Sequence, residues 1–134
     1  ANVNTYYYAQ GTPILRDGKT LSGNYIDTFV GLDWVIRHSN TALTDVMIKN
    51  NKLPFNATGI NVLEAALNSV FSTAWGNGIV ADKDDGTMDA TVTALPVDEL
   101  KNADVSARKY KGLSWSYKPA NSIDDAYITG QITL

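Results

Sequence analysis

One segment, residues 53–78, has the pattern of an amphipathic helix that must lie against other parts of the chain. At 100° per residue its large apolar side chains fall on one stripe, and the opposite face is polar. The stripe consists of Ile60, Leu63, Leu67, Val70, Phe71 and Ala74. Burying these side chains contributes roughly 10 kcal/mol of gross hydrophobic free energy. The rest of the chain therefore has to supply a surface that covers the stripe.

Both ends of this helix carry residues that favour helix termini. Asn56 is a good N-cap, and it places Phe55 at N′ and Ile60 at N4, the two positions that form a hydrophobic staple. Residues 76–78 read Gly-Asn-Gly, and both residue types can adopt the left-handed conformation that closes a helix. We therefore expect a helix that begins after Asn56 and is ended by Gly76-Asn77-Gly78.

A second amphipathic helix is predicted from about Tyr25 to Asn50. Asn24 and Asp27 have the spacing of a capping box in acidic form. The predicted apolar stripe consists of Tyr25, Phe29, Leu32, Ile36, Leu43 and Met47, and the other face carries Asp27, His38, Asp45 and Lys49. The link to the next helix is short, so the two helices should be antiparallel neighbours. Trp34 lies off the stripe, where it should pack beneath a loop or contact another molecule.

Short segments with the patterns of strands surround the two helices. Residues 6–9 predict a first strand, and Asp17-Gly18 predicts a type I′ turn. That turn would pair Ile14 with Leu21 and Arg16 with Lys19. Further strands are predicted at residues 90–95, 113–117 and 127–134, with helical turns at residues 104–110 and a loop at residues 118–126. The predicted fold class is α+β, with two antiparallel amphipathic helices packed on a small, mostly antiparallel β-sheet.

Composition argues against several classes of protein. The chain has 134 residues, about one domain, and its apolar runs are far shorter than the roughly 20 residues that cross a membrane. It has 11 basic and 14 acidic residues without a basic cluster, which argues against a nucleic-acid partner. It has no cysteine, so disulfides are excluded. Because the chain begins at Ala1, we expect a single domain cut from a longer protein or a processed chain.

No set of residues has the spacing of an active site. His38 is the single histidine, and it has no acidic partner at one-turn spacing. A group of carboxylates suggests calcium, but the twelfth position of such a loop is Thr93 and not an acid. These carboxylates are Asp82, Asp84, Asp85 and Asp89. Glu64 and Glu99 lie outside the apolar surroundings that a general acid needs. We therefore predict a protein that is not an enzyme and has no metal or cofactor.

Two alternatives stay open. In the first, the chain is a receptor- or carbohydrate-binding module. Its aromatic side chains would then meet on one surface and stack against a sugar, and the residues concerned are Tyr6-Tyr7-Tyr8, Trp115 and Tyr117. Alternatively, Asp82, Asp84 and Asp89 would hold a divalent metal in an enzyme.

Four segments, in this order and spacing, carry a resemblance to a known family. They are the tyrosine-rich strand, the helix start Gly-Asn-Tyr-Ile-Asp-Thr-Phe-Val-Gly-Leu-Asp-Trp-Val, the link Lys-Leu-Pro-Phe-Asn-Ala-Thr-Gly-Ile and the final Tyr-Ile-Thr-Gly-Gln-Ile-Thr-Leu. The chain resembles the C-terminal region of sheath-like proteins from contractile-tailed bacteriophages, a family long filed as a phage domain of unknown function. The resemblance spans Tyr6 to Leu134, but residues 82–111 carry no motif that matches.

This resemblance implies a structural role in the virion. The chain would be the C-terminal inner domain of a sheath subunit, and its partners would be other copies of the sheath protein and the tail tube protein. In sheath proteins extended terminal arms add strands to sheets of neighbouring subunits, and the arm here would be Tyr127 to Leu134. The candidate interface residues are Trp34, Tyr127, Ile128, Thr129, Gln131, Ile132 and Leu134.

Overall fold

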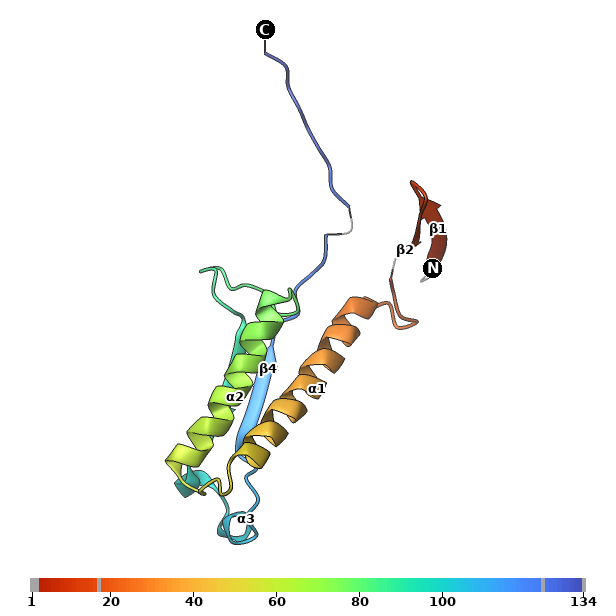
Figure 1. Cartoon of the computed structure of the whole chain (residues 1–134). Coiled ribbons are helices and arrows are strands. Elements are labelled where there is room, and N and C mark those ends of the chain that lie inside the picture. The colour runs from red at the N-terminus through yellow and green to blue at the C-terminus, as the bar shows by residue number, and fades with distance from the viewer. Residues whose placement is uncertain (1–2, 17, 124, 134) are drawn as a thin grey trace.

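The computed structural model describes residues 3–16, 18–123 and 125–133. Its two long helices, α1 (Ile26–Lys49) and α2 (Ala57–Gly76), lie side by side and antiparallel (Figure 1). Strands β3 (Ala90–Ala94) and β4 (Leu113–Tyr117) form an antiparallel pair, and β3 contacts α2. A separate hairpin consists of β1 (Thr5–Ala9) and β2 (Thr12–Arg16), and the connection from β3 to β4 contains the short helices η1 (Val97–Glu99) and α3 (Asn102–Ser106). The chain therefore has an α+β fold, as predicted.

Helix α2 confirms the pattern in its sequence. All six side chains of the predicted stripe are buried, together with Gly59. Asn56 is the N-cap, and its Oδ1 accepts a hydrogen bond from the Gly59 N–H at 3.1 Å. At the other end Gly78 has a φ of +75°, and its N–H donates to the carbonyl of Trp75 at 3.1 Å. Gly78 thus closes the helix in the left-handed conformation, which glycine adopts without a steric penalty.

Phe71 lies at the centre of the core and is fully buried. Its ring centroid is 5.4 Å from that of Trp115 and 5.9 Å from that of Tyr117, both on β4. Along β3 and β4 half-buried residues alternate with exposed ones, so only one face of this sheet is covered. The core thus lies between α2 and the sheet, and Val35 of α1 and Val80 complete it.

Helix α1 departs from the predicted stripe, although its boundaries agree with the prediction to one residue. Its buried residues are Gly31, Val35 and Ser39. Of the predicted stripe, Leu32 and Leu43 are only half-buried, and the other four side chains, Tyr25, Phe29, Ile36 and Met47, are exposed. The reason is that α1 packs through another face: Val35 joins the core cluster of Phe71 and Ala74, and Gly31 lies against Ile79, just after α2. The sheet of two strands is too narrow to cover both helices.

The predicted capping box of α1 is wrong. The N-cap is Tyr25 and not Asn24, and none of the described side chains caps the helix. Asn24 instead belongs to a turn: its carbonyl accepts from the Thr20 N–H at 2.7 Å, and its side chain donates to Ser22 Oγ at 3.3 Å. An asparagine whose polar groups are engaged in a turn is no longer available for the helix.

The position of the first hairpin turn is also corrected. The chain turns at Gln10-Gly11, whose φ values of 49° and 81° are both positive, as a type I′ turn requires. Strand β2 therefore pairs with β1, and Ile14 lies opposite Tyr7 and not opposite Leu21. Likewise Arg16 lies opposite Thr5 and not Lys19. Asp17 of the predicted turn lies outside the described residues.

The two strands of the second sheet agree with the prediction, whereas the helical turns and the end of the chain do not. Strand β3 ends one residue before the predicted end, and β4 has the predicted bounds. The helical turns come earlier than predicted, at Asn102–Ser106. Residues 127–133 are not a strand, because nothing in the described part of the chain pairs with them. None of the described helices has both the length and the apolar character that crossing a membrane requires.

The N-cap of α2 gives a direct test of local stability. Asn56→Ala is expected to lower the free energy of unfolding by about 1 kcal/mol, because the Gly59 N–H loses its partner. The matched control is Asn61→Ala, an exposed residue in the same helix, which should change that free energy by less than about 0.5 kcal/mol. Urea denaturation followed by circular dichroism measures both, and equal effects would contradict the capping role.

Candidate functional site

Strand β4 has one backbone edge without a partner among the described residues. It belongs to a sheet of only two strands, with β3 on one side. The Lys118 N–H, just after β4, donates to the Asp89 carbonyl, just before β3, at 3.0 Å. Backbone groups of successive residues point to opposite edges, so those of Leu113, Trp115 and Tyr117 face the open edge. An open edge of this kind can pair with a further strand.

An apolar groove lies beside this edge, between α1 and β4. Its volume is about 300 Å³, and it is lined by Thr28, Phe29, Leu32, Trp115, Ser116, Tyr117 and Pro119. Burial raises the pKa of the Tyr117 hydroxyl above its usual value, as expected of apolar surroundings. A strand added to β4 at this edge would therefore lie next to the first turns of α1.

The exposed apolar side chains of α1 continue from this groove along the helix. At the far end of α1, Leu43 and Met47 help to line a second apolar pocket of about 230 Å³. There the Tyr110 hydroxyl donates to the Leu95 carbonyl at 2.8 Å, and its pKa is raised by burial and then by the charge of Glu64. The stripe that the sequence presents as core is thus largely an uncovered surface.

After β4 the chain continues as an extended segment, residues 121–123 and 125–133, which we call the tail. It runs away from the helices (Figure 1), and all of its described residues are exposed. Tyr127 and Ile128 are each about 95% exposed, and Ile132 is 88% exposed. Near its base, Ser122 Oγ donates to Asp27 Oδ2 at 2.8 Å, which ties the tail to the start of α1. Of the candidate interface residues, Leu134 lies outside the described part of the chain.

Trp34, the other candidate interface residue, has contacts within its own chain. It is half-buried and packs against the core. The ring of His38 stacks on it, with centroids 3.8 Å apart, and His38 Nδ1 lies 2.8 Å from the Trp34 carbonyl oxygen. Trp34 is thus neither freely accessible nor fully enclosed, and the tail is the stronger candidate for an interface.

Two of the acidic residues near residue 85, Asp82 and Asp85, bond to different partners. Asp82 Oδ1 accepts a hydrogen bond from Trp75 Nε1 at 2.6 Å. Asp85 Oδ1 accepts from the hydroxyl and the backbone N–H of Thr87, which lowers the pKa of that carboxyl. Within residues 3–16, 18–123 and 125–133, no group of three or more histidine, aspartate and glutamate side chains is placed to hold a metal ion.

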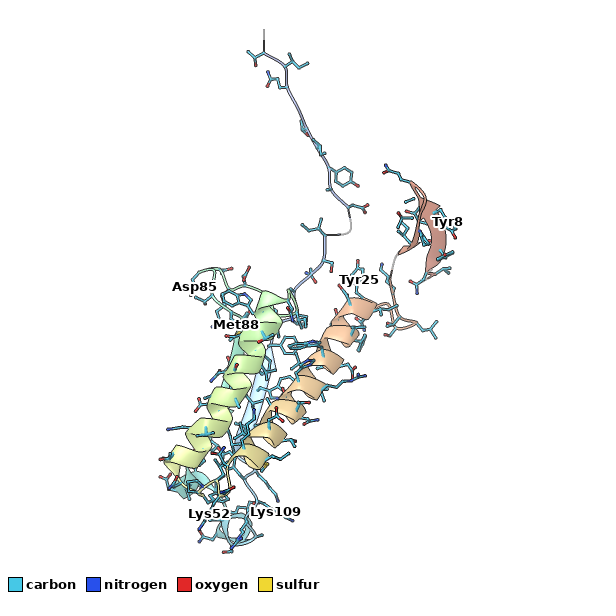
Figure 2. All side chains as sticks on the ribbon, viewed as in Figure 1. Tyr8, Tyr25, Lys52, Asp85, Met88 and Lys109 are labelled. Carbon is cyan, nitrogen blue, oxygen red and sulfur yellow. The ribbon has the colours of Figure 1, made fainter. Side chains whose placement is uncertain are left out.

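The aromatic residues proposed as a sugar platform lie in two places. Trp115 and Tyr117 pack on Phe71 beneath α2. Tyr6 and Tyr8 lie on the hairpin, with their ring centroids 5.9 Å apart, and Figure 2 shows Tyr8 on that hairpin, well away from the helices. The structure therefore does not bring these residues onto one surface.

The uncovered α1 stripe was missed as a functional surface, although its residues were correctly identified as one face of a helix. The sequence contains one indication of this surface, which is a second face of the same helix. That face carries Gly31, Val35 and Ser39, and these are the residues of α1 that are buried. No protein-family model matches the chain, and no curated protein matches its sequence.

Proposed function

We propose that the chain is a structural subunit of a contractile phage tail sheath, or of a similar sheath-like assembly, and that it acts by polymerising around a tail tube. In this proposal the tail of one copy adds a strand to the open edge of β4 in a neighbouring copy. The partners are then other copies of the protein and the tube protein, and the site of action is the tail of the virion.

One observation carries the proposal: within the described part of the chain, the open edge of β4 pairs with no further strand, and residues 127–133 are extended and pair with no strand. The edge lies beside an apolar groove, and the tail alternates apolar and polar residues, with Ile128 and Ile132 on one face. If the tail is added as a strand, the backbone N–H and C=O groups of the tail and of the β4 edge form hydrogen bonds with each other, and the apolar face of the tail is buried. An exchange between copies links each subunit to the next without a catalytic site.

The order of the sequence segments supports the same proposal. The resemblance to sheath-like proteins covers both the tail and the start of α1, where Phe29 and Leu32 line the groove. The tail and its proposed acceptor surface thus both lie within the part of the chain that resembles the family.

The proposal is tested by placing charge on one face of the tail in the intact protein. Ile128→Asp combined with Ile132→Asp is expected to abolish assembly into tubes seen by electron microscopy. Each isoleucine side chain contributes roughly 2 kcal/mol when it is buried, so losing both would weaken each link by about a thousandfold.

The matched control carries the same charges on the opposite face, as Thr129→Asp combined with Gln131→Asp. This variant should still form tubes, because those side chains point to solvent in the docked strand. Tubes of normal length from the isoleucine variant would contradict the proposed role of the tail.

A further inference from the structure

Gly130 has no evident role within its own chain. Its φ is not in the left-handed region that favours glycine, and a Cβ placed on it would meet no atom within 4 Å. Glycine also weakens an extended segment, because it has high conformational entropy and no side chain to pack. A reason for glycine in the middle of an alternating segment is therefore to be sought in the docked state.

The alternation of side chains limits how the tail can pair with β4. In an antiparallel pair, residues directly opposite each other point to the same face of the sheet. The covered face of β4 carries Leu113, Trp115 and Tyr117, and these same residues direct their backbone groups to the open edge. The apolar positions of the tail, 128, 130 and 132, must therefore lie opposite them, because a slip of one residue would turn both isoleucines to solvent.

We infer that the tail of a second copy pairs antiparallel with β4 in the register that places Gly130 opposite Trp115. Ile128 then lies opposite Tyr117, and Ile132 lies opposite Leu113. This register matches the whole of β4 with the centre of the tail. The inference rests on the proposed function, because it names the register of the same strand exchange.

The size of the Trp115 side chain explains the glycine. The Trp115 ring packs against both Phe71 and Tyr117, at centroid distances of 5.4 Å and 5.9 Å. A side chain at position 130 would lie beside the indole on the same face and compete for this space. Glycine has no side chain, so the indole of Trp115 can occupy this space. The aromatic ring then covers the glycine on the neighbouring strand, an arrangement that is known to stabilise sheets. Ile128, opposite Tyr117, then lies at the groove beside Phe29.

The register is tested by disulfide trapping, because these 134 residues contain no cysteine that would form competing disulfides. Ser116 and Thr129 are exposed and would lie opposite each other as a pair without mutual hydrogen bonds, with Cα atoms about 4.5 Å apart. That separation lies within the range of a disulfide. Ser116→Cys protein is mixed with Thr129→Cys protein under oxidising conditions, so that the heterodimeric bond links different copies.

The expected result is a disulfide between the two chains, identified by mass spectrometry of the linked peptides. The matched control is Ser114→Cys mixed with Thr129→Cys, which corresponds to a slip of two residues and should link at least tenfold more slowly. Faster linking of the control pair would overturn the register and leave the exchange of strands intact. If neither pair links, both the register and the proposed exchange are contradicted.

A second variant tests the role of glycine itself. Gly130→Leu is expected to slow trapping of the Ser116–Thr129 pair by about tenfold or more, as overpacking beside Trp115 requires. Gln131→Leu, on the opposite face of the tail, should leave the trapping rate within about twofold. Equal rates for Gly130→Leu and the unsubstituted tail would show that no bulky side chain faces position 130, and would overturn the inference.

Discussion

Gly59→Ala is expected to destabilise the chain by about 3 kcal/mol, although alanine is the better helix former by about 1 kcal/mol. A Cβ on Gly59 would lie far inside contact distance of the Pro54 carbonyl oxygen. That oxygen belongs to the backbone of the link between α1 and α2, so it cannot move aside as the end of a flexible side chain could. The link or the first turn of α2 must shift, and the bond from Gly59 to the Asn56 cap is disturbed as well.

The matched control is Gly76→Ala at the last residue of the same helix. A Cβ there meets no atom within 4 Å, and the φ of Gly76 is not in the left-handed region. This change should be neutral or stabilising by up to about 1 kcal/mol, because alanine reduces the entropy of the unfolded chain. Thermal unfolding by circular dichroism separates the two, with a loss of roughly 10 °C expected for Gly59→Ala. Equal midpoints would contradict the close approach of the link to α2.

Phe71→Ala is expected to have the largest effect on stability, about 3–5 kcal/mol. Phe71 is fully buried and touches two aromatic rings of β4, so its removal leaves a cavity that rigid neighbours cannot fill. The protein loses the free energy gained by transferring the Phe71 ring out of water, and it also loses the van der Waals contacts between that ring and its neighbours. Because an ordinary domain is stable by only about 5–15 kcal/mol, this change removes a large share of the total free energy of unfolding.

The matched control removes the same ring from the uncovered stripe of α1. Phe29 is 47% exposed, so Phe29→Ala should cost no more than about 1.5 kcal/mol. Urea denaturation with a common m-value gives the comparison. A cost for Phe29→Ala as large as that for Phe71→Ala would mean that the α1 stripe is covered in the isolated chain.

The sequence of α2 was sufficient to predict its ends and its buried face. Asn56, the stripe and Gly78 are local signals whose meaning does not depend on the rest of the fold, and α2 has cover along its whole length. For α1 the periodicity correctly identified one apolar face, but a pattern of side chains does not state whether the protein's own chain or another molecule covers that face. Four of these apolar residues have the helical spacing that is typical of a buried face, and yet they are exposed: Tyr25, Phe29, Ile36 and Met47.

The first hairpin and the tail show the same limit of sequence patterns in strands. Asp17-Gly18 and Gln10-Gly11 are both suitable turns, and the choice depends on which segment pairs with β1, which is a property of the tertiary structure. The alternation in residues 127–133 predicts a strand correctly only if a partner edge is within reach. The sequence thus indicates strand-forming potential in the tail, and the open edge of β4, which sequence patterns do not reveal, indicates where a strand could bind.

The most direct test of the proposed function is electron microscopy of the intact protein expressed alone and purified at increasing concentration. If subunits are linked by strand exchange, the protein should form long cylinders, and removal of residues 127–134 should leave only separate particles. Cylinders that persist after this removal would contradict the exchange of the tail. An intact protein that stays monomeric at every concentration would contradict a sheath-like role.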